Sequence, residues 1–343
     1  MNNAYPIDVF PSGAVVLGHR ICCDGFHRDY EVRVQTHVHI DHMDSFETSK
    51  GTQNIFMSEP TRRLLVCEFN ADLPYRQNVQ ALELGVPRAV EDHQVVLLHS
   101  GHMLGSVQVA VQLPSGMRLG YSGDFRWPLE EVIEVDALVI DSTYGSPDRR
   151  REYTQEQVEE RFLNLVLGRV MRGPVYIKAH RGTLQRALQI LTGQVNCPML
   201  GSGRLCSEVE VYREHGYAIG SICLAASDEG RTHLKSGKFI RFYGTGDEFP
   251  VQITKGSAIT LSAYMSRPDD PVMEYSDCSF GVALSNHADF LGTLDYIKAT
   301  KAKYVVTDNT RGHAAELAQE VAQRLGIPAR PSTTTYSREW GVS

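Results

Sequence analysis

The chain has 343 residues, a formal net charge of −7 and a hydrophobic content of 42%. This length allows one large or two medium domains, and the acidic balance argues against a tight, non-specific nucleic-acid binder. No apolar run approaches a membrane span, and residues 1–5 lack the charged and apolar regions of a signal peptide. Seven cysteines without paired spacing indicate reduced thiols. We therefore expect a protein of the cytoplasm or, in a eukaryote, of the nucleus, with no membrane partner.

The first part of the chain is rich in predicted strands. Residues 31–36 alternate apolar with polar side chains, as a half-buried strand does, and residues 94–99 form a second strand. Residues 114–116 are the predicted turn of a hairpin that ends near Tyr121. One helix is predicted among these strands, from about residue 59 to residue 69.

The first of these strands leads directly into a metal-binding pattern, His37-Val38-His39-Ile40-Asp41-His42. At the strand period of two, His37 and His39 point the same way, while Asp41 and His42 fall where the strand gives way to a loop or a helix start. Divalent metals take imidazole nitrogens and carboxylate oxygens, and zinc is the commonest occupant of such sets. The spacing therefore predicts two adjacent metal sites, one for each pair of residues.

Two later loops complete the predicted ligand set. His102 follows a strand and lies between Gly101 and Gly105, which permit a tight loop. Asp124 follows Gly123 after the hairpin, at the end of a strand. An aspartate after a glycine would fit a simple turn equally well, so the assignment of Asp124 depends on its order in the chain and on the histidines before it.

After about residue 146 helices alternate with strands. Thr154 to Gln157 form a capping-box-like start, and the apolar residues that follow recur at helical spacing. The later predicted strands are residues 175–178, 218–224 and 304–307, and the later predicted helices are residues 183–191, 208–215, 289–299 and 314–325. Such alternation predicts a parallel sheet with crossover helices. Residues 146–280 carry nearly equal numbers of acidic and basic residues, so most of the net negative charge belongs to the rest of the chain.

In this order, the ligand set resembles the metallo-β-lactamase fold, in which the aspartate that matches Asp124 bridges two metals. Two further segments are similar to the β-CASP nuclease branch of that fold: residues 141–145, with the sequence Asp-Ser-Thr-Tyr-Gly, match its motif A, and His287 matches its motif B histidine. The resemblance spans residues 37 to about 310 and is specific for the family rather than for a substrate.

The resemblance implies an α/β architecture with two interleaved domains. Residues 1–145 and 281–343 would form an αββα metallo-β-lactamase sandwich, and residues 146–280 would form an inserted α/β β-CASP domain. It also implies two divalent ions, zinc in both sites with manganese as an alternative in the second. The implied ligands are His37, His39 and His102 for one ion, Asp41 and His42 for the other, and Asp124 between them.

The resemblance assigns catalytic roles beside the metals. A metal ion lowers the pKa of bound water to about 7 and so provides a hydroxide nucleophile; Asp41 is counted with the catalytic residues for this reason. His287 is the predicted general acid for the departing 3′-oxygen, and Asp141 would hold its tautomer and raise its pKa. Taken alone, His287 would fit a core or capping role better.

One departure from the family pattern bears on the substrate. Ribonucleases of the β-CASP branch usually carry a histidine, motif C, after the strand that corresponds to residues 304–307, and this chain has Asp308 there. DNA-directed members, which include the cross-link repair, Artemis-like and bacterial ligase-associated nucleases, are the closer match, because the repair nucleases also lack that histidine and share a Gly-Asp-Phe-Arg string like residues 123–126. Asp308 fits a ligand of the second metal and a turn-forming residue equally well. His313 heads a helix and is assigned a surface or capping role.

A site for a terminal phosphate is predicted in the inserted domain. Residues 178–183 run from a strand end into a helix start, where free backbone N–H groups and the helix dipole favour an anion. The predicted phosphate ligands are Lys178, His180, Arg181, Thr183 and, from a separate loop, Arg267. Capping by Thr183 with an exposed Arg181 is an equally good interpretation, and residues 149–151, three arginines, are interpreted as a solvated loop.

We therefore expect a dimetal phosphodiesterase that acts on DNA, as an exonuclease that prefers a 5′-phosphate. The first alternative is a β-CASP ribonuclease with the same chemistry on RNA. A second is a small-molecule hydrolase such as a lactonase or β-lactamase, which the metal pattern alone would permit but which the inserted domain and the pair of Asp141 with His287 oppose. A third is a non-catalytic scaffold, which the intact ligand set opposes.

Overall fold

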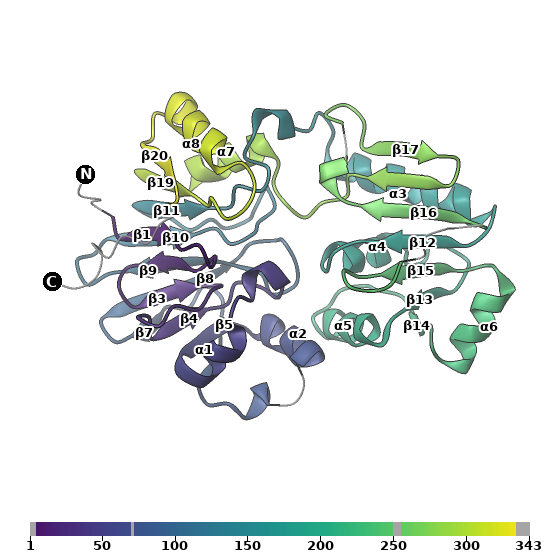
Figure 1. Ribbon diagram of the computed structural model, residues 1–343, viewed down its shortest axis with the longest axis horizontal. Helices are drawn as coiled ribbons and strands as arrows, with labels where there is room; N and C mark the ends of the chain where they lie inside the picture. The colour runs from purple at the N-terminus through teal and green to yellow at the C-terminus, as the bar shows by residue number, and fades with distance from the viewer. Residues whose placement is uncertain (1–4, 70–71, 250–254, 266, 334–343) are drawn as a thin grey trace. The chain divides into compact units, whose positions relative to one another are not determined.

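The structure, a computed structural model, describes residues 5–69, 72–249, 255–265 and 267–333. The chain forms two compact units, shown in Figure 1: the first unit comprises Met1–Arg150 and His287–Ser343, and the second unit comprises Arg151–Asn286. These units differ by a few residues at each junction from the predicted domains.

The strands of the first unit are β1 (Ile7–Val9), β2 (Val15–Leu17), β3 (Ile21–Cys23), β4 (Val32–Val34), β5 (Asn54–Ser58), β6 (Val79–Leu82), β7 (Arg88–Val90), β8 (His93–His99), β9 (Val107–Gln112), β10 (Arg118–Tyr121), β11 (Ala137–Ile140), β19 (Tyr304–Thr307) and β20 (Ala329–Pro331). Its helices are α1 (Phe46–Thr52), α2 (Glu59–Phe69), α7 (Phe290–Ala299) and α8 (Ala314–Glu320), with short 3-10 helices at Ile40–His42, Leu73–Tyr75 and Pro147–Arg149 and a π-helical turn at Val321–Leu325.

Two sheets pack face to face in the first unit. One has the strand order β1-β2-β3-β4-β5-β6 and the other β20-β19-β11-β10-β9-β8-β7. Apolar side chains from alternate positions of both sheets, such as Val34 and Val109, meet in one buried cluster between them. The β9–β10 hairpin turns at residues 114–116, as predicted, with Gly116 at φ 86° and its N–H donating to the carbonyl of Leu113.

Helices cover the outer faces of both sheets in the first unit (Figure 1). Phe290 and Leu294 of α7 and Leu317 of α8 share a second buried cluster with Leu138 of β11. On the other side, Ser49 of α1 accepts a hydrogen bond from the buried side chain of Arg33 in β4. The first unit is therefore layered as helices, sheet, sheet and helices, and its site residues lie on loops that leave these strands.

The second unit has the strands β12 (Val175–Lys178), β13 (Met199–Gly201), β14 (Cys223–Leu224), β15 (Ile240–Tyr243), β16 (Ser257–Leu261), β17 (Val272–Ser276) and β18 (Ser279–Val282), and the helices α3 (Gln155–Val170), α4 (Thr183–Leu191), α5 (Gly203–Glu214) and α6 (Asp228–Ser236), with a 3-10 turn at Ala263–Met265. Its sheet has the order β14-β13-β15-β12-β16-β18-β17, and every neighbouring pair is parallel except β17 with β18. The predicted parallel sheet with crossover helices is thus confirmed, and so is the α/β class of the chain.

Several predicted elements have their expected bounds, and the capping box of α3 is present. Gln157 N–H donates to Oγ1 of Thr154 at 3.3 Å, and Thr154 N–H donates to Oε1 of Gln157 at 2.8 Å. Helix α4, strand β12 and strand β19 coincide with residues 183–191, 175–178 and 304–307.

Other element predictions were wrong in extent. The strand expected at residues 218–224 is reduced to Cys223–Leu224, because the N–H of Gly220 turns to Oγ1 of Thr192 at 2.8 Å. Helix α5 begins before the expected residue 208, since Ser202 caps it. Helices α1 and α6 were not predicted, and the helix expected at residues 314–325 is α-helical only to Glu320.

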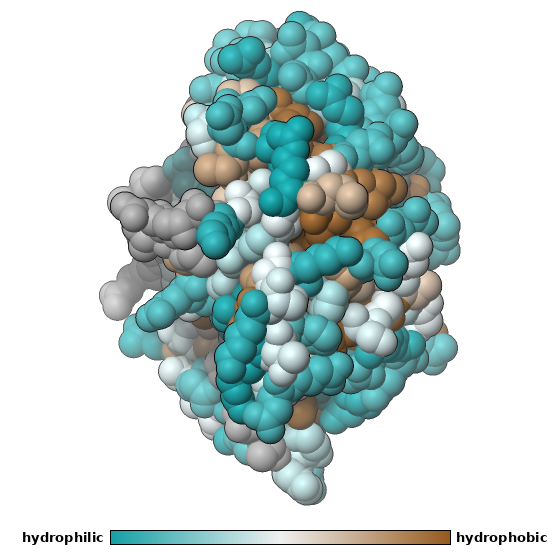
Figure 2. Space-filling model, turned by 90° about the vertical axis from the view of Figure 1, so that its right-hand side faces the viewer, coloured by the Kyte–Doolittle hydropathy of each residue, from teal (hydrophilic) through white to brown (hydrophobic). Residues whose placement is uncertain are grey.

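The surface carries mostly hydrophilic side chains on the face shown in Figure 2, with a hydrophobic area set among them. Among the described residues of the second unit, Met171, Leu224 and Tyr275 are large, exposed and hydrophobic. Within the described ranges, no helix combines the length and the apolar character needed to cross a membrane.

Candidate active site

The histidine run of the first unit lies just beyond a strand. Strand β4 ends at Val34, and the 3-10 helix Ile40–His42 begins after His39, which adopts extended backbone angles. His37 and His39 therefore sit in the turn that joins the two elements, not in the strand itself. The expected helix start at the end of the run is present.

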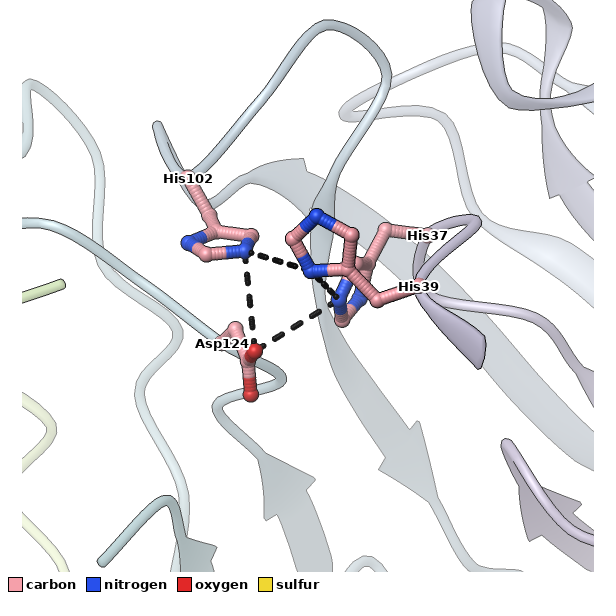
Figure 3. A group of neighbouring side chains, drawn as sticks. All are labelled: His37, His39, His102 and Asp124. Carbon is pink, nitrogen blue, oxygen red and sulfur yellow. Dashed lines mark hydrogen bonds and ion pairs between the residues drawn. The ribbon is translucent and has the colours of Figure 1, made fainter. Parts of the chain in front are cut away.

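Four side chains of this unit converge on one point (Figure 3). Nδ1 of His39 lies 3.1 Å from Nε2 of His37 and 3.1 Å from Nε2 of His102, and these two Nε2 atoms each lie 3.5 Å from Oδ2 of Asp124. Tetrahedral ligands at about 2.0–2.1 Å from a zinc ion are separated by roughly 3.3 Å. The spacing of the four atoms therefore fits a single tetrahedral ion.

The protonation states of this cluster also suit a cation. Burial lowers the pKa of His37 and of His39, and the neighbouring imidazoles lower both further, so the rings are neutral. Nδ1 of His39 faces two imidazole nitrogens at once and can share a proton with only one of them. Burial alone would raise the pKa of Asp124, but the charges of His42 and His287 and the hydrogen bonds from His37 and His42 lower it well below its ordinary value. Two neutral imidazoles, a third imidazole from His102 and a carboxylate are a metal-ligand set.

Glycines shape the loops that deliver His102 and Asp124. Gly105 has φ 83°, and a Cβ there would lie 2.6 Å from the backbone nitrogen of Thr61. Gly123 has φ 55°, and a Cβ there would lie 2.6 Å from a carbonyl oxygen of β9. Any larger residue at either position would push the loop away from the strands, which is the physical reason for the glycines that the sequence displays.

His42 lies beside this cluster and is fully buried. Its Nε2 is 3.2 Å from Oδ1 of Asp124 and 3.6 Å from Oδ2 of Asp41. These two buried atoms, Nε2 of His42 and Oδ1 of Asp124, have no hydrogen-bond partner among the described residues besides each other, which is expected of two atoms that could bind a cation. Burial and Arg311 lower the pKa of His42, but Asp124 and Asp24 raise it to about 10, so a metal ion at Nε2 must displace a proton.

Asp24 is a candidate functional residue that the sequence did not indicate. Its carboxylate is 1% exposed, and Oδ2 lies 2.7 Å from Nδ1 of His42 and accepts from Oγ1 of Thr36 at 2.7 Å. A carboxylate in this position fixes the ring and leaves Nε2 for a ligand. The only sequence signal was the Asp24-Gly25 pair, which is a turn signal and says nothing of a contact with a residue eighteen positions later.

Arg33 hydrogen-bonds the backbone of the same region, and it too was not predicted from the sequence. Its fully buried guanidinium donates to the carbonyls of Asp24 at 2.6 Å, His42 at 3.0 Å and Asp44 at 2.8 Å. In the sequence it is only a polar residue in an alternating strand, which predicts an exposed side chain. The outer face of β4 is instead covered by α1, whose Phe46 lies 5.1 Å from the guanidinium.

Asp41 and Asp308, the two carboxylates expected to complete a second metal site, lie beside Arg311 and not within the cluster of the other predicted ligands. Asp41 is about half exposed, and Oδ2 lies 3.2 Å from Nε of Arg311. Asp308 is buried, accepts from Thr310 N–H at 2.8 Å and lies 3.7 Å from Nη1 of Arg311. The groups of three or more potential ligands among the described residues include neither Asp41 nor Asp308. Their role as metal ligands stays a prediction.

The predicted acid–base pair lies beside the first cluster. Nδ1 of His287 is 3.2 Å from Oδ2 of Asp141, and Nε2 is 3.8 Å from Oδ2 of Asp124. The other oxygen of Asp141 accepts from the N–H and hydroxyl of Thr143 at 2.8 and 2.6 Å. The ring of His287 packs edge-on against His102 at 4.4 Å, with its side chain 19% exposed. The arrangement therefore orients one nitrogen on a carboxylate and turns the other toward the candidate metal position.

The predicted phosphate ligands of the second unit lie around the end of β12. Nε of Arg181 is 2.9 Å from the buried carboxylate of Glu208, Nδ1 of His180 is 3.1 Å from Oγ1 of Thr245, and Nζ of Lys178 lies 5.6 Å from the ring of Phe249. The cap of α4 is Gly182, not Thr183, and its N–H donates to Oε1 of Gln185 at 2.7 Å. Arg267 is exposed.

A cavity of about 540 Å³ lies at the same edge of the second unit's sheet. It is lined by Ser202, Arg241, Phe242, Tyr243, Asp247, Glu248 and Phe249. Arg241 lies over the ring of Tyr243 at 4.8 Å, and Tyr243 contacts Phe249 edge-on at 5.1 Å. Ligands of open parallel sheets bind at the carboxyl ends of the strands, where this cavity opens.

Comparisons with known proteins give partial matches. No protein-family model matches the chain. An Acidianus ambivalens protein named "Uncharacterized protein in lig 3'region" is 31% identical over 138 residues, which cover 39% of this chain and 98% of that protein. The DNA cross-link repair 1A protein of Mus musculus is 30% identical over 130 residues, 36% of this chain and 12% of that protein. An RNase J-like protein of Methanocaldococcus jannaschii is 23% identical over 213 residues, 53% of this chain and 49% of that protein.

A solved structure shares the fold over most of the chain. A protein of unknown function from Enterococcus faecalis V583 superposes with a TM-score of 0.60 and 14% sequence identity, covering 85% of this chain and 78% of the other. At this identity the likeness concerns the fold alone.

Proposed function

We propose that this chain, which belongs to one family with the Acidianus ambivalens protein, is a metal-dependent nuclease of the metallo-β-lactamase superfamily. The two relatives with functional names, a DNA cross-link repair protein and an RNase J-like protein, support the superfamily and a nucleic-acid substrate. The chain matches about a tenth of the first protein and about half of the second. The proposed activity is therefore based on the residues of this chain and not on the activities of these relatives.

The observation that carries the proposal is the convergence of His37, His39, His102 and Asp124 beside the pair of His287 and Asp141. A divalent ion in this cluster supplies a nucleophile from water at neutral pH and a positive charge for the phosphate oxygens. Asp124 is buried and ionised, so it holds the cluster together at any pH near neutrality. The four ligands come from three separate loops, which is typical of a catalytic site positioned by a rigid scaffold.

His287 is proposed as the general acid. With Nδ1–H held on Asp141, the protonated ring carries its transferable proton on Nε2, the nitrogen that faces the cluster. Asp141 is in turn fixed by two hydrogen bonds from Thr143, which keep its other oxygen in place to orient the ring of His287. This pair would deliver a proton to the 3′-oxygen that leaves when a phosphodiester bond is cut.

DNA with a 5′-phosphorylated end is the proposed substrate. The aspartate at position 308 and the Gly-Asp-Phe-Arg string at residues 123–126 resemble DNA-directed members, although Phe125 itself is a core residue that packs on Tyr296 at 4.3 Å. Lys178, His180 and Arg181 are the proposed phosphate ligands. The pairing of Arg181 with Glu208 offsets part of its charge, so a phosphate there would depend on all three side chains.

RNA is the second candidate substrate, favoured by the RNase J-like relative, whose match covers more of this chain than the match to the DNA repair protein. One experiment separates the two and tests the function. Purified full-length protein is assayed for bound metal and for cleavage of end-labelled DNA and RNA of one sequence, each with a 5′-phosphate or a 5′-hydroxyl. Metal-dependent cleavage that chelator abolishes supports the proposal. Cleavage that persists in strong chelator, or no cleavage of either polymer by the metal-loaded protein, contradicts it.

A further inference from the structure

Arg311 lies where two of the predicted ligands of the second ion meet. It belongs to the loop that follows β19, and its side chain is only 14% exposed. The loop is held close to the end of β11: His313 N–H donates to the carbonyl of Ser142 at 2.8 Å, and a Cβ on Gly312, which has φ 64°, would lie 2.0 Å from that carbonyl oxygen. Arg311 is therefore presented by a turn that only glycine permits.

The guanidinium of Arg311 engages both carboxylates. Nε lies 3.2 Å from Oδ2 of Asp41, Nη2 donates to the carbonyl of Asp41 at 2.6 Å, and Nη1 lies 3.7 Å from Oδ2 of Asp308. Nη1 also approaches Nδ1 of His42 at 3.3 Å. Arginine does not lose its proton in proteins, so this charge is permanent.

A second ion would share these two carboxylates with a fixed positive charge. The four ligands predicted for it are Asp41, His42, Asp124 and Asp308, and Arg311 holds two of them. Nε2 of His42 and Oδ1 of Asp124, 3.2 Å apart, remain directed at a common point, while Oδ2 of Asp41, 3.6 Å from that Nε2, is shared with Arg311. Two ligands beside a like charge bind a divalent ion far more weakly than the cluster of His37, His39, His102 and Asp124.

We propose that the guanidinium of Arg311 takes the place of the second ion beside Asp41 and Asp308. The chain then holds one tightly bound ion, and Arg311 supplies the fixed positive charge on the Asp41 side. This inference rests on the proposed metal-dependent function and departs from the expectation of two equivalent ions. It assigns Asp308 to Arg311 as its ion-pair partner instead of to a metal.

Metal stoichiometry tests the proposal without reference to activity. The full-length protein is stripped with chelator, dialysed and titrated with Zn²⁺ and, separately, Mn²⁺ by calorimetry, and bound metal is counted after gel filtration. We expect one tight ion per chain in the wild type. In Arg311→Gln a second ion should bind at least about tenfold more tightly than in the wild type, because the like charge is removed and two carboxylates are released.

Three further variants separate charge from packing. Arg311→Lys keeps the positive charge and should keep one tight ion. Asp308→Asn in the wild-type background should leave the single ion bound, and in Arg311→Gln it should weaken the second ion. Arg330→Gln is the matched control, since it breaks another arginine–aspartate pair of this unit, with Asp8 at 3.2 Å, and should change no metal affinity.

Two outcomes overturn the inference. One is a wild type that binds two ions with similar affinity, and the other is a second-ion affinity that is the same in Arg311→Gln as in the wild type. If Arg311→Gln does not fold, loss of an ion from Asp308→Asn is the overturning result and retention of the single ion supports the proposal. A protein that binds no metal and cuts neither DNA nor RNA would instead overturn the proposed function.

Discussion

Replacement of Asp24 by asparagine tests how the buried scaffold sets the chemistry of His42. The substitution keeps the size of the side chain and keeps Oδ1, which accepts from the N–H of Thr36 at 2.7 Å. It turns Oδ2 into an NH₂ group that faces two donors, Nδ1 of His42 and the hydroxyl of Thr36, both at 2.7 Å. The imidazole of His42 must then change its tautomer or its orientation.

The size of the effect follows from these contacts. A hydrogen bond to a charged group contributes about 1.5–3 kcal/mol, and a buried donor left without an acceptor costs about 1–3 kcal/mol. We expect the metal-free Asp24→Asn protein to be less stable by about 2–4 kcal/mol, because Thr36 can rotate its hydroxyl and recover part of the loss. The affinity for an ion at Nε2 of His42 should fall about 10–100-fold, the usual effect of removing a carboxylate that orients a histidine ligand, while the ion held by His37, His39, His102 and Asp124 should stay bound.

The stability difference depends on pH in a defined direction. Burial would raise the pKa of Asp24, but the charge and hydrogen bond of His42 lower it, so Asp24 stabilises the fold above about pH 4 and loses this contribution as the pH falls through its lowered pKa. His42, with its pKa raised to about 10, stabilises the fold fully below about pH 6.5 and loses this contribution as the pH rises toward 10. The difference between wild type and Asp24→Asn should therefore be largest between about pH 4 and 6.5.

The assays are urea unfolding of the metal-free proteins from pH 3 to 10 and calorimetric titration with Zn²⁺. Asp92→Asn is the matched control, because it breaks an aspartate–histidine pair of similar length, 2.6 Å to Nδ1 of His93, at a carboxylate that is exposed. That variant should leave metal affinity unchanged. Equal affinity of Asp24→Asn and the wild type for an ion on the His42 side, or a stability difference that does not vary with pH, would refute the role given to Asp24.

Three further predictions concern the chemistry and the substrate. Asp124→Ala should lose bound metal and activity more completely than His39→Ala, as metal analysis of both variants would measure, since Asp124 faces both candidate ion positions; an active Asp124→Ala enzyme would exclude the mechanism. His287→Ala should lower kcat by about 10²–10⁴ on DNA with metal content unchanged, and much less on a p-nitrophenyl phosphodiester, whose leaving group needs no acid; equal losses on both would mean that His287 is structural. Arg181→Ala should raise KM for 5′-phosphorylated ends only, an effect that shrinks in high salt; no dependence on the 5′-phosphate would remove the anion site.

The features that were predicted correctly depend on contacts between residues that are close in the sequence. The capping box at Thr154 and the bounds of α4 follow from contacts within a few residues, and the hairpin follows from its turn. The run from His37 to His42 was recognisable because its ligand types lie within six positions. Helices α1 and α6 were missed although α6 carries a Ser227 cap, because their few buried side chains leave no clear apolar period.

Long-range contacts account for what the sequence did not show. Asp24 reaches His42, Arg33 reaches the carbonyl of Asp44, and Arg311 reaches Asp41 across 270 positions of the chain. No spacing rule connects such residues, because their distance is set by the packing of two sheets and by loops held by glycine. Each of them looks like an ordinary turn or surface residue in the sequence alone.

The charges around His42 show why these unpredicted residues matter for function. Asp24 and Asp124 are buried carboxylates on the two sides of the ring, and burial of such charges is costly unless cations lie close to them. The buried Arg33 hydrogen-bonds the backbone around this pair, and Arg311 adds a second fixed positive charge from the loop after β19. The remaining positive charge comes from a proton on His42 or from a bound ion, and these two exclude each other at Nε2. Metal binding to the His42 side is thus linked to release of a proton, so its affinity should rise with pH until His42 is neutral.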